Sequence, residues 1–505
     1  DVSTNDLLEL WEEDDRTAAV LLYVETFGNP EHFGRIAQRV SRRKPILAVK
    51  GRRAAQALRH EARSHTAAVL RGDAVVDALF RQAGVLRFRS GDELFNAAAF
   101  FGSQPLPLGR RIGIVSNSAG VATLACDACT TRGLVVGIAS GDTGNPVVLG
   151  MRARAEQYEA ALHSLLDDQG LDAVMVYYVD LLGGDPEAVL AAISRVCAEQ
   201  AKPVVASILG AEGTLPPGAA DSVPNFVFPE ACAAVLGRAI ERREWLSRPL
   251  GQRPRYEDLD PLSARTLIRS SLEHAGGEGG GWLTLAETEA LLATHGIGVV
   301  SSKRCGDVEA AGAAAAEIGA PIALKADFPA PAQAGDSDAV LLGLEGDSAV
   351  RAGWRELQRR VQVAGRKWMG AIVQRLVPPG ADLLVGALRD PDLGLVMALG
   401  LGGRQAGLAG TAAFRVLPST DVEADELLDA SESVVTQLEG FRGAPRLDRE
   451  ALRDLVLRFA FLLQDIPEIV ETDLNPVRCM SHGCVVLDTR VRVERRRPVE
   501  RIKTW

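Results

Sequence analysis

Short apolar runs alternate with segments of helical spacing through the first half of the chain. The runs are continuously apolar, whereas the apolar residues between them recur at intervals of three and four. This pattern predicts strands at residues 18–24, 45–49, 112–115, 134–138, 173–178 and 203–207, and helices that include residues 30–41, 72–83 and 119–132. Strands that are apolar on both faces and separated by helices are typical of a parallel, doubly wound sheet. The expected fold class is therefore α/β.

Changes in this pattern divide the chain into parts. A proline-rich stretch, 105–109, separates a first α/β unit (1–105) from a second (106–246). Residues 247–281 are rich in proline and glycine, so we expect an interdomain linker that contains a short helix. Thr284 and Glu287 then have the spacing of a capping box, which predicts a helix to about residue 295 at the start of a third domain (282–495). Residues 496–505 form a tail.

Composition and charge exclude several classes of partner. The net charge is −10 with 24% charged residues, which argues against nucleic-acid binding. No apolar run approaches the ~20 residues that span a bilayer, so no membrane partner is expected. The 7 cysteines lack the spacing of a disulfide framework and predict reduced thiols in the cytoplasm.

His65 is the first candidate for chemistry. A neutral imidazole can accept a phosphoryl group and pass it on. A carboxylate that fixes its orientation is available in Glu25, at the end of the first predicted strand. Helix N-termini can hold the phosphate, and the sequence offers one at Gly28 and Asn29 and another at Ser118-Ala119-Gly120. The alternative is that His65 is an ordinary polar residue at a helix start.

A second candidate is a predicted hairpin near the end of the chain. If its turn centres on residues 481–482, Asn475 faces Asp488 with side chains about 5 Å apart. Oxygen ligands so placed suit Mg²⁺. Pro476 could introduce a bulge and shift this register, and a polar edge hairpin is the alternative. Lys325 ends an apolar run in a chain with only 7 lysines against 49 arginines. It is either a ligand-binding lysine or a lysine that protects an edge strand.

These motifs resemble those of the NDP-forming acyl-CoA synthetases, relatives of succinyl-CoA synthetase. Ser64-His65-Thr66, preceded by 44–52, is similar to the family's phosphohistidine segment. The resemblance implies two flavodoxin-like domains followed by an ATP-grasp domain, with phosphorylation at His65 and support from Glu25. It implies CoA, ATP or ADP, and Mg²⁺ as ligands. The residues expected to contact Mg-ATP are Lys325, Val373, Gln374, Asp382, Gly402, Gly403, Asn475 and Asp488.

The chain also departs from the family pattern. Gln333 stands where the family has a second phosphohistidine, and Ala334 replaces the lysine beside it. Asp338-Ala339 replaces a glycine pair, and Gly407, Val148 and Ala67 replace a glutamate, an aspartate and a glycine. These differences predict a weakened or lost phosphoryl relay.

Three functions remain open. The first is a ligase that converts a carboxylic acid, CoA and ATP to acyl-CoA, ADP and phosphate through an acyl phosphate and phosphohistidine at His65. The second is a catalytically weak or inactive regulatory region that senses acyl-CoA or nucleotide in a GNAT-type lysine acetyltransferase, and the third is a scaffold. The first residues resemble the sequence that follows the family's CoA-binding domain. This implies such a domain in the same longer chain, and the resemblance also implies a homo-oligomer.

Overall fold

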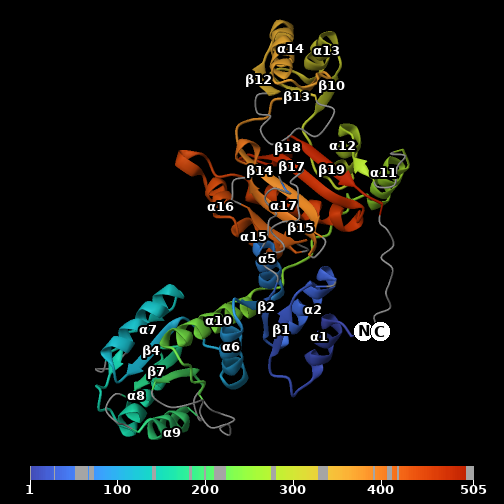
Figure 1. Ribbon diagram of the computed structural model, residues 1–505. Helices are drawn as coiled ribbons and strands as arrows, with labels where there is room; N and C mark the ends of the chain where they lie inside the picture. Colours follow the sequence, from blue (N-terminus) through green and yellow to red (C-terminus); the bar gives the residue numbers. More distant parts are fainter. Residues whose placement is uncertain are drawn as a thin grey trace. The chain divides into compact units, whose positions relative to one another are not determined.

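The computed structural model describes most of the chain. The described residues are 2–27, 29–51, 66, 73–138, 144–180, 185–197, 201–209, 223–274, 280–327, 339–390, 393–406, 412–417 and 420–495. They form two compact units (Figure 1). The first unit comprises residues 1–52 and 80–248, and the second comprises 53–79 and 249–504. No helix within the described ranges is long and apolar enough to cross a membrane.

The first unit begins with a small parallel sheet of order β1-β2-β3. Its strands are β1 (Val20–Val24), β2 (Ile46–Lys50) and β3 (Val85–Phe88), and its helices are α1 (Thr4–Glu13), α2 (Pro30–Arg43) and α6 (Gly91–Ser103). Helix α5 (Asp73–Ala83) includes residues of both units. Asn29 caps α2 by accepting a hydrogen bond from the His32 amide at 3.0 Å. Pro30 follows at the first helical position, where a missing N–H costs nothing. The predicted strand–helix alternation is confirmed here.

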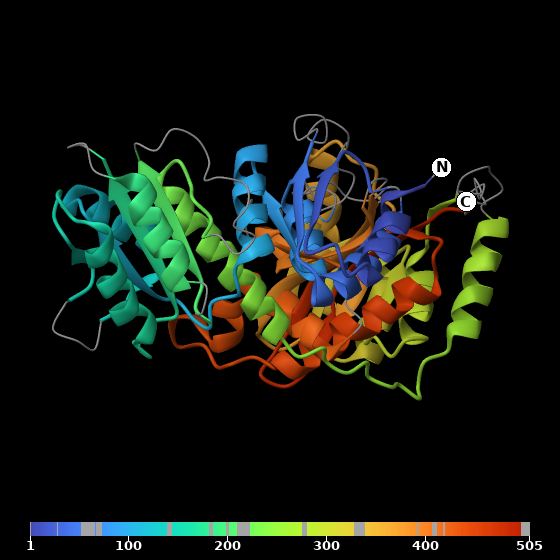
Figure 2. The ribbon, with the colours of Figure 1, turned by 90° about the horizontal axis from the view of Figure 1, so that it is seen from below.

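A second parallel sheet completes the first unit, with order β5-β4-β7-β8 and β6 beside β4. Its strands are β4 (Arg111–Ser116), β5 (Val135–Val136), β6 (Val147–Val148), β7 (Ala173–Val179) and β8 (Val204–Leu209); its helices are α7 (Ala119–Thr131), α8 (Ala155–Asp167), α9 (Pro186–Cys197) and α10 (Pro229–Ser247). Helices cover both faces (Figure 2), which explains the continuously apolar strands. The strand predicted at 134–138 is shorter than expected, because β5 is an edge strand that pairs with β4 at only two positions.

Contacts from α10 join the two sheets into one unit. Arg242 is buried and donates to the Ser41 carbonyl at 2.9 Å, and burial lowers the pKa of its guanidinium to about 10. The Arg42 guanidinium lies 4.4 Å from the centre of the Trp245 ring. Trp245 also covers Gly84, where a Cβ would lie 2.5 Å from the indole ring. The close approach requires glycine at position 84.

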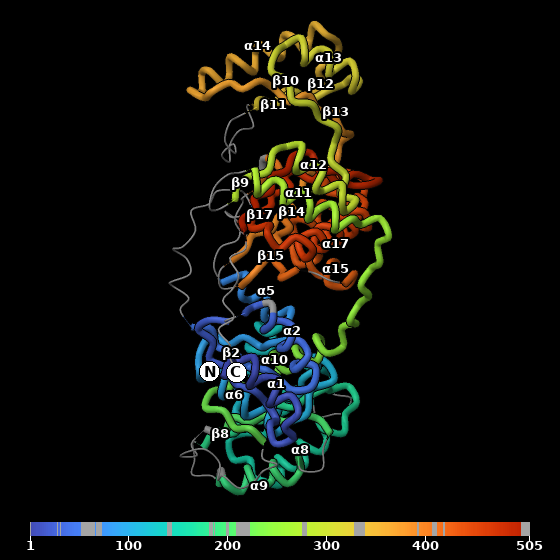
Figure 3. The backbone as a smooth tube through the Cα atoms, turned by 90° about the vertical axis from the view of Figure 1, so that its right-hand side faces the viewer, coloured from blue at the N-terminus to red at the C-terminus, as the bar shows by residue number. Residues whose placement is uncertain are grey.

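The second unit contains a small lobe built on an antiparallel sheet of order β10-β13-β11-β12. Its elements are β10 (Ser302–Cys305), α13 (Val308–Ile318), β11 (Ile322–Ala326), β12 (Val340–Leu344), α14 (Gly346–Val363) and β13 (Ala371–Arg375). The two helices lie together against this sheet (Figure 3). Leu324 and Val373 belong to the buried core between them.

The large lobe of the second unit has the order β16-β15-β14-β17-β19-β9, with β18 paired to β17. Its strands are β9 (Gly281–Trp282), β14 (Ala381–Asp390), β15 (Gly394–Leu401), β16 (Ala413–Val416), β17 (Ile469–Cys479), β18 (Cys484–Val486) and β19 (Thr489–Val493). Its helices are α11 (Pro261–His274), α12 (Leu285–Ala293), α15 (Asp421–Asp429), α16 (Glu432–Glu439) and α17 (Arg449–Asp465), with short 3₁₀ turns η2 (Gly403–Gln405) and η3 (Phe441–Gly443). The apolar face of α17 fills the core beneath this sheet.

The segment expected to be a linker, 247–281, is largely packed against the large lobe. Ala264, Ile268 and Leu272 of α11 belong to the same buried core as α17. The Tyr256 hydroxyl donates to Asp454 at 2.7 Å. The expected short helix is a 14-residue helix whose apolar stripe is buried, so residues 249–274 belong to the second unit and are not a free connection.

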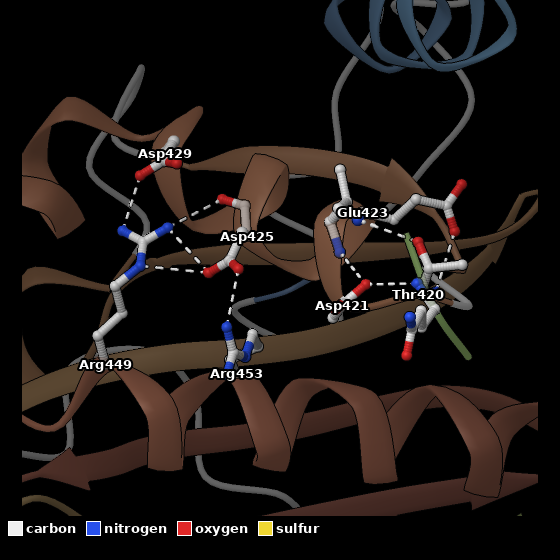
Figure 4. Close-up of polar contacts among 9 residues, drawn as sticks. Thr420, Asp421, Glu423, Asp425, Asp429, Arg449 and Arg453 are labelled. Carbon is white, nitrogen blue, oxygen red and sulfur yellow. Dashed lines mark hydrogen bonds and ion pairs between the residues drawn. The ribbon is translucent and has the colours of Figure 1, made fainter. Parts of the chain in front are cut away.

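Helices α15 and α17 are joined by an ionic cluster (Figure 4). Asp425 accepts hydrogen bonds from Arg449 and Arg453, each at 3.0 Å, whereas Asp429 accepts one from Arg449, at 2.7 Å. At the start of α15, Thr420 and Glu423 form a capping box. Asp421 accepts from the Gln252 amide at 2.7 Å, which ties the segment after α10 to this helix.

We expect Asp425→Ala to lower the free energy of unfolding by about 1 kcal/mol, because it removes the shared acceptor of two arginines. Asp429→Ala is the matched control: its side chain is 60% exposed, and we expect a loss below about 0.5 kcal/mol. Urea denaturation followed by circular dichroism measures both values. Equal losses in the two variants would show that the shared geometry of Asp425 contributes nothing.

Candidate functional site

Two side chains of the small lobe contact one backbone carbonyl of the large lobe. Lys325 Nζ and Gln374 Nε2, both from the small lobe, donate to the Leu487 carbonyl at 2.8 Å each. Strand β11 lies between β13 and β12, so Lys325 is not on an edge strand and does not serve to protect one. Because side chains alternate along a strand, Leu324 and Val373 point into the small-lobe core while Lys325 and Gln374 share the other face.

The hairpin that carries Leu487 has the predicted register. Cys479 pairs with Cys484, and the Asn475 amide donates to the Asp488 carbonyl at 2.9 Å. Pro476 does not shift this pairing. The bulge that it was expected to allow lies instead on the other side of β17, where the pairing with β14 shifts between Leu383 and Val385. The hairpin therefore brings Asn475, Leu487 and Asp488 to one place.

The predicted glycine loop lies beside this hairpin. Asn475 Oδ1 accepts a hydrogen bond from the Gly403 amide at 2.8 Å. A Cβ at Gly402 would lie 2.4 Å from the backbone of Leu383, so only glycine allows the loop to approach β14 this closely. Asp488 Oδ1 accepts from the Thr489 amide at 2.9 Å, which orients the carboxylate.

Burial and two nearby carboxylates have opposite effects on the pKa of the Lys325 ammonium. Burial lowers the pKa of the Lys325 ammonium, and the nearby carboxylates of Asp488 and Asp382 act in the opposite direction. Asp382 is itself held by Arg478, through contacts of 2.6 and 3.2 Å. Arg478 is absent from the sequence-based set of site residues. Its signal is the cross-strand register, in which it lies opposite Asp382.

Acidic residues continue along the same face of β17. Glu471 and Asp473 are buried and alternate with Thr472. Glu471 pairs with Arg492 at 3.2 Å, and its second carboxylate oxygen has no hydrogen-bond partner within the described part of the chain. Asp473 accepts from the Thr66 hydroxyl at 3.1 Å. Thr66 therefore contacts the large lobe, and its neighbour His65 lies outside the described residues.

The candidates in the first unit lie on two separate loops. Glu25 is exposed at the end of β1, and its carbonyl accepts from Lys50 Nζ at 2.6 Å. Lys50 is buried and was missed by the sequence reasoning, although it lies in the stretch that precedes the histidine segment. Ser118 caps α7, with Ala119 and Gly120 exposed at its start. Gly28 lies outside the described residues, as do the departures at Gln333, Ala334, Asp338 and Gly407.

Asn475 and Asp488 offer two oxygen ligands, which suit a metal ion that also binds water and substrate. In the residues that the structure describes, no group of three or more His, Cys, Asp or Glu side chains could hold a metal ion. Magnesium is commonly held by one or two protein ligands together with water and substrate phosphates. The amide oxygen of Asn475 and the carboxylate of Asp488 match that second mode and not a dedicated protein cage.

Comparison with known proteins agrees with this architecture. Residues 274–493 match the ATP-grasp domain family, and residues 1–101 match the succinyl-CoA ligase-like flavodoxin domain family. The ADP-forming acetate–CoA ligase I of Archaeoglobus fulgidus is 29% identical over 96% of this chain and 72% of that protein. The chain belongs to the NDP-forming acyl-CoA synthetase family. The predicted α/β fold class is confirmed, with a succinyl-CoA ligase-like flavodoxin domain and an ATP-grasp domain.

Other proteins are also similar to this chain. The ADP-forming 4-hydroxybutyrate–CoA ligase of Nitrosopumilus maritimus is 25% identical over 97% of this chain and 72% of that protein. Among solved structures, the acetyl-coenzyme A synthetase 1 of Ca. Korarchaeum cryptofilum, in complex with coenzyme A and Ca-AMPCP, is 31% identical. The match covers 46% of this chain and 100% of the solved chain, with a TM-score of 0.41.

We expect Lys325→Met to leave the free energy of unfolding at pH 7 unchanged or to raise it. The substitution removes a desolvated ammonium, and Gln374 continues to donate to the Leu487 carbonyl. Because the pKa of Lys325 is lowered from 10.5 in the folded chain, the unfolded chain holds this proton more tightly. The wild type should therefore gain stability relative to the variant as the pH rises towards 10.5. Urea denaturation at neutral and alkaline pH measures this, and a variant that is clearly less stable at pH 7 would contradict it.

Proposed function

We propose that this protein is an ADP-forming acid–CoA ligase, which converts a carboxylic acid, CoA and ATP to acyl-CoA, ADP and phosphate. The observation that carries the proposal is the convergence of Lys325 and Gln374 with Asn475 and Asp488 around Leu487. A cation from one lobe and oxygen ligands from the other meet the requirements of a magnesium nucleotide. Family membership and the names of the relatives support the reaction.

Each nucleotide-site residue has a defined task in this proposal. Lys325 contacts the phosphates, because a partly desolvated ammonium interacts more strongly with an anion than an exposed one. When Lys325 exchanges its hydrogen bond to the Leu487 carbonyl for one to a phosphate oxygen, the ammonium still has an acceptor. Asn475 Oδ1 and Asp488 would hold Mg²⁺, which would neutralise charge on the phosphates. Gln374, Asp382 and the Gly402-Gly403 loop orient the nucleotide.

His65 is the phosphoryl acceptor in this proposal, and the first unit supplies the anion sites. His65 attacks the γ-phosphorus of ATP and releases ADP, and Glu25 orients the imidazole. The carboxylate substrate then takes the phosphoryl group from His65, and the CoA thiol displaces phosphate from the acyl phosphate. The helix starts at Asn29 and at Ser118-Ala119-Gly120 hold the transferred phosphate.

One sequence observation favours a second function. Gln333 and Ala334 replace the second histidine and the lysine beside it, so the relay would require direct transfer between ATP and His65. Under the alternative, the chain binds acyl-CoA or nucleotide as a regulatory region of a GNAT-type acetyltransferase and does not turn over. The two functions differ in whether His65 becomes phosphorylated.

We expect Mg-ATP to bind the ATP-grasp half. At 100 times its dissociation constant it should add roughly 2.7 kcal/mol to the free energy of unfolding. The double variant Asn475→Ala, Asp488→Ala should lose the magnesium dependence of binding while remaining folded, and Asp347→Ala on α14, with a side chain 63% exposed, is the control. Isothermal titration calorimetry and thermal unfolding measure both effects. If millimolar Mg-ATP gave no heat and no thermal shift, the proposed nucleotide site would be contradicted.

We expect labelled ATP to give an acid-labile, base-stable phosphate on His65. The variant His65→Ala should abolish this adduct, and Glu25→Gln should slow its formation by loosening the orientation of the imidazole. Intact-mass spectrometry and phosphate analysis under acid and base measure the adduct. Nucleotide binding without any phosphate on His65, in the presence of all substrates, would contradict the ligase and favour the regulatory function.

A further inference from the structure

Thr66 occupies a defined position on the large lobe. Its side chain is fully buried, and its hydroxyl lies 3.1 Å from Asp473 Oδ1 and 3.4 Å from the Thr472 carbonyl. Both acceptors belong to β17, two and three residues before Asn475. The hydroxyl carries one hydrogen, so the two acceptors share it, with the carboxylate at the shorter distance.

Gly386 on the neighbouring strand provides the space for Thr66. It pairs with Asp473 across β14 and β17. A Cβ at Gly386 would lie 1.9 Å from Thr66 Oγ1, and 2.8 and 2.9 Å from the Cγ2 and Cβ atoms of Thr66. Glycine in the interior of a strand weakens the strand and commonly marks a close approach by another part of the chain. The absent side chain of Gly386 is therefore explained by space and not by backbone conformation.

The surroundings of Thr66 are those of the nucleotide site and not of an apolar core. By the period of two along β17, Asp473 shares a face with Glu471 and Asn475, while Leu474 points into the apolar core on the other side. Asp473 is 5% exposed and Glu471 is 2% exposed. Burying carboxylates is costly, and a core that needed only to accommodate a threonine would not require them.

We propose that Gly386, Asp473 and the Thr472 carbonyl form a seat for Thr66, which positions the adjoining His65 for phosphoryl transfer at the nucleotide site. The inference rests on the proposed function, in which His65 is the acceptor. Adjacent Cα atoms are about 3.8 Å apart, so a Thr66 held in this way would limit how far the adjoining His65 can move. Thr66, Asp473 and Gly386 are positioning residues that do not contact the transferred group.

The test distinguishes the positioning of His65 by Thr66 from the binding of the nucleotide. Gly386→Ala fills the seat, and Thr66→Val keeps the shape of the side chain while removing its hydroxyl. We expect Gly386→Ala to slow the labelling of His65 by at least tenfold, and Thr66→Val to slow it severalfold. The Mg-ATP dissociation constant should change less than twofold in both variants. Thr66→Ser, which retains the hydroxyl, should restore most of the rate. Gly298→Ala is the control, because a Cβ there meets nothing within 4 Å.

A second readout does not depend on phosphorylation. Hydrogen–deuterium exchange of the peptide that contains Thr66 should be faster in Gly386→Ala than in the wild type and in Gly298→Ala. If His65 of the wild type is never labelled, the proposed function fails, and faster exchange in Gly386→Ala still supports the seat itself. Unchanged exchange, labelling at the wild-type rate, or a parallel loss of Mg-ATP affinity would overturn the proposal.

Discussion

The register of the hairpin formed by β17 and β18 is the constraint on which the rest of the site depends. It places the Asp488 carbonyl opposite the Asn475 amide and aims the Leu487 carbonyl at the small lobe. A shift by one residue would turn each side chain of β17 to the other face of the sheet. Asp473 and Asn475 would then enter the apolar core, and Leu474 would enter the site. The apolar face of α17, packed beneath this sheet, makes such a shift costly.

Glycines and buried charges also shape the site: the glycines leave room for other segments, and the charges are available to a ligand. Gly402 and Gly386 lie on or beside β14, and each leaves room for another segment: the backbone of Leu383 in one case and Thr66 in the other. Lys325 remains partly desolvated near the carboxylates of Asp488 and Asp382, at a cost that a purely structural residue would avoid. Sites that bind charged ligands commonly retain such strained electrostatics, because the ligand relieves them.

Much of the fold is visible in the sequence, because it depends on local patterns. Continuously apolar runs predicted the parallel strands, and Asn29, Ser118 and Thr284 are side chains that cap helices where the spacing indicated. The hairpin register followed from counting outward from one turn. These inferences need only neighbours in the sequence.

The misses have a common physical cause. The contact of Lys325 with Leu487 spans 162 residues, and the ion pair of Arg478 with Asp382 spans 96. Neither is encoded by local spacing. The segment 247–281 was read as a linker from its proline and glycine content, yet the apolar stripe of α11 is buried against helices far along the chain. The seat for Thr66 needed both a strand pairing and the missing Cβ of Gly386, which only the assembled lobe reveals.

The most direct test of the account is an experimental structure of the protein with Mg²⁺ and a non-hydrolysable ATP analogue. The account predicts a metal ion at about 2.1 Å from both Asn475 Oδ1 and an Asp488 carboxylate oxygen. It also predicts that Lys325 Nζ has exchanged the Leu487 carbonyl for a phosphate oxygen. A nucleotide bound elsewhere, or one bound while Asn475 and Asp488 remain without metal, would contradict it.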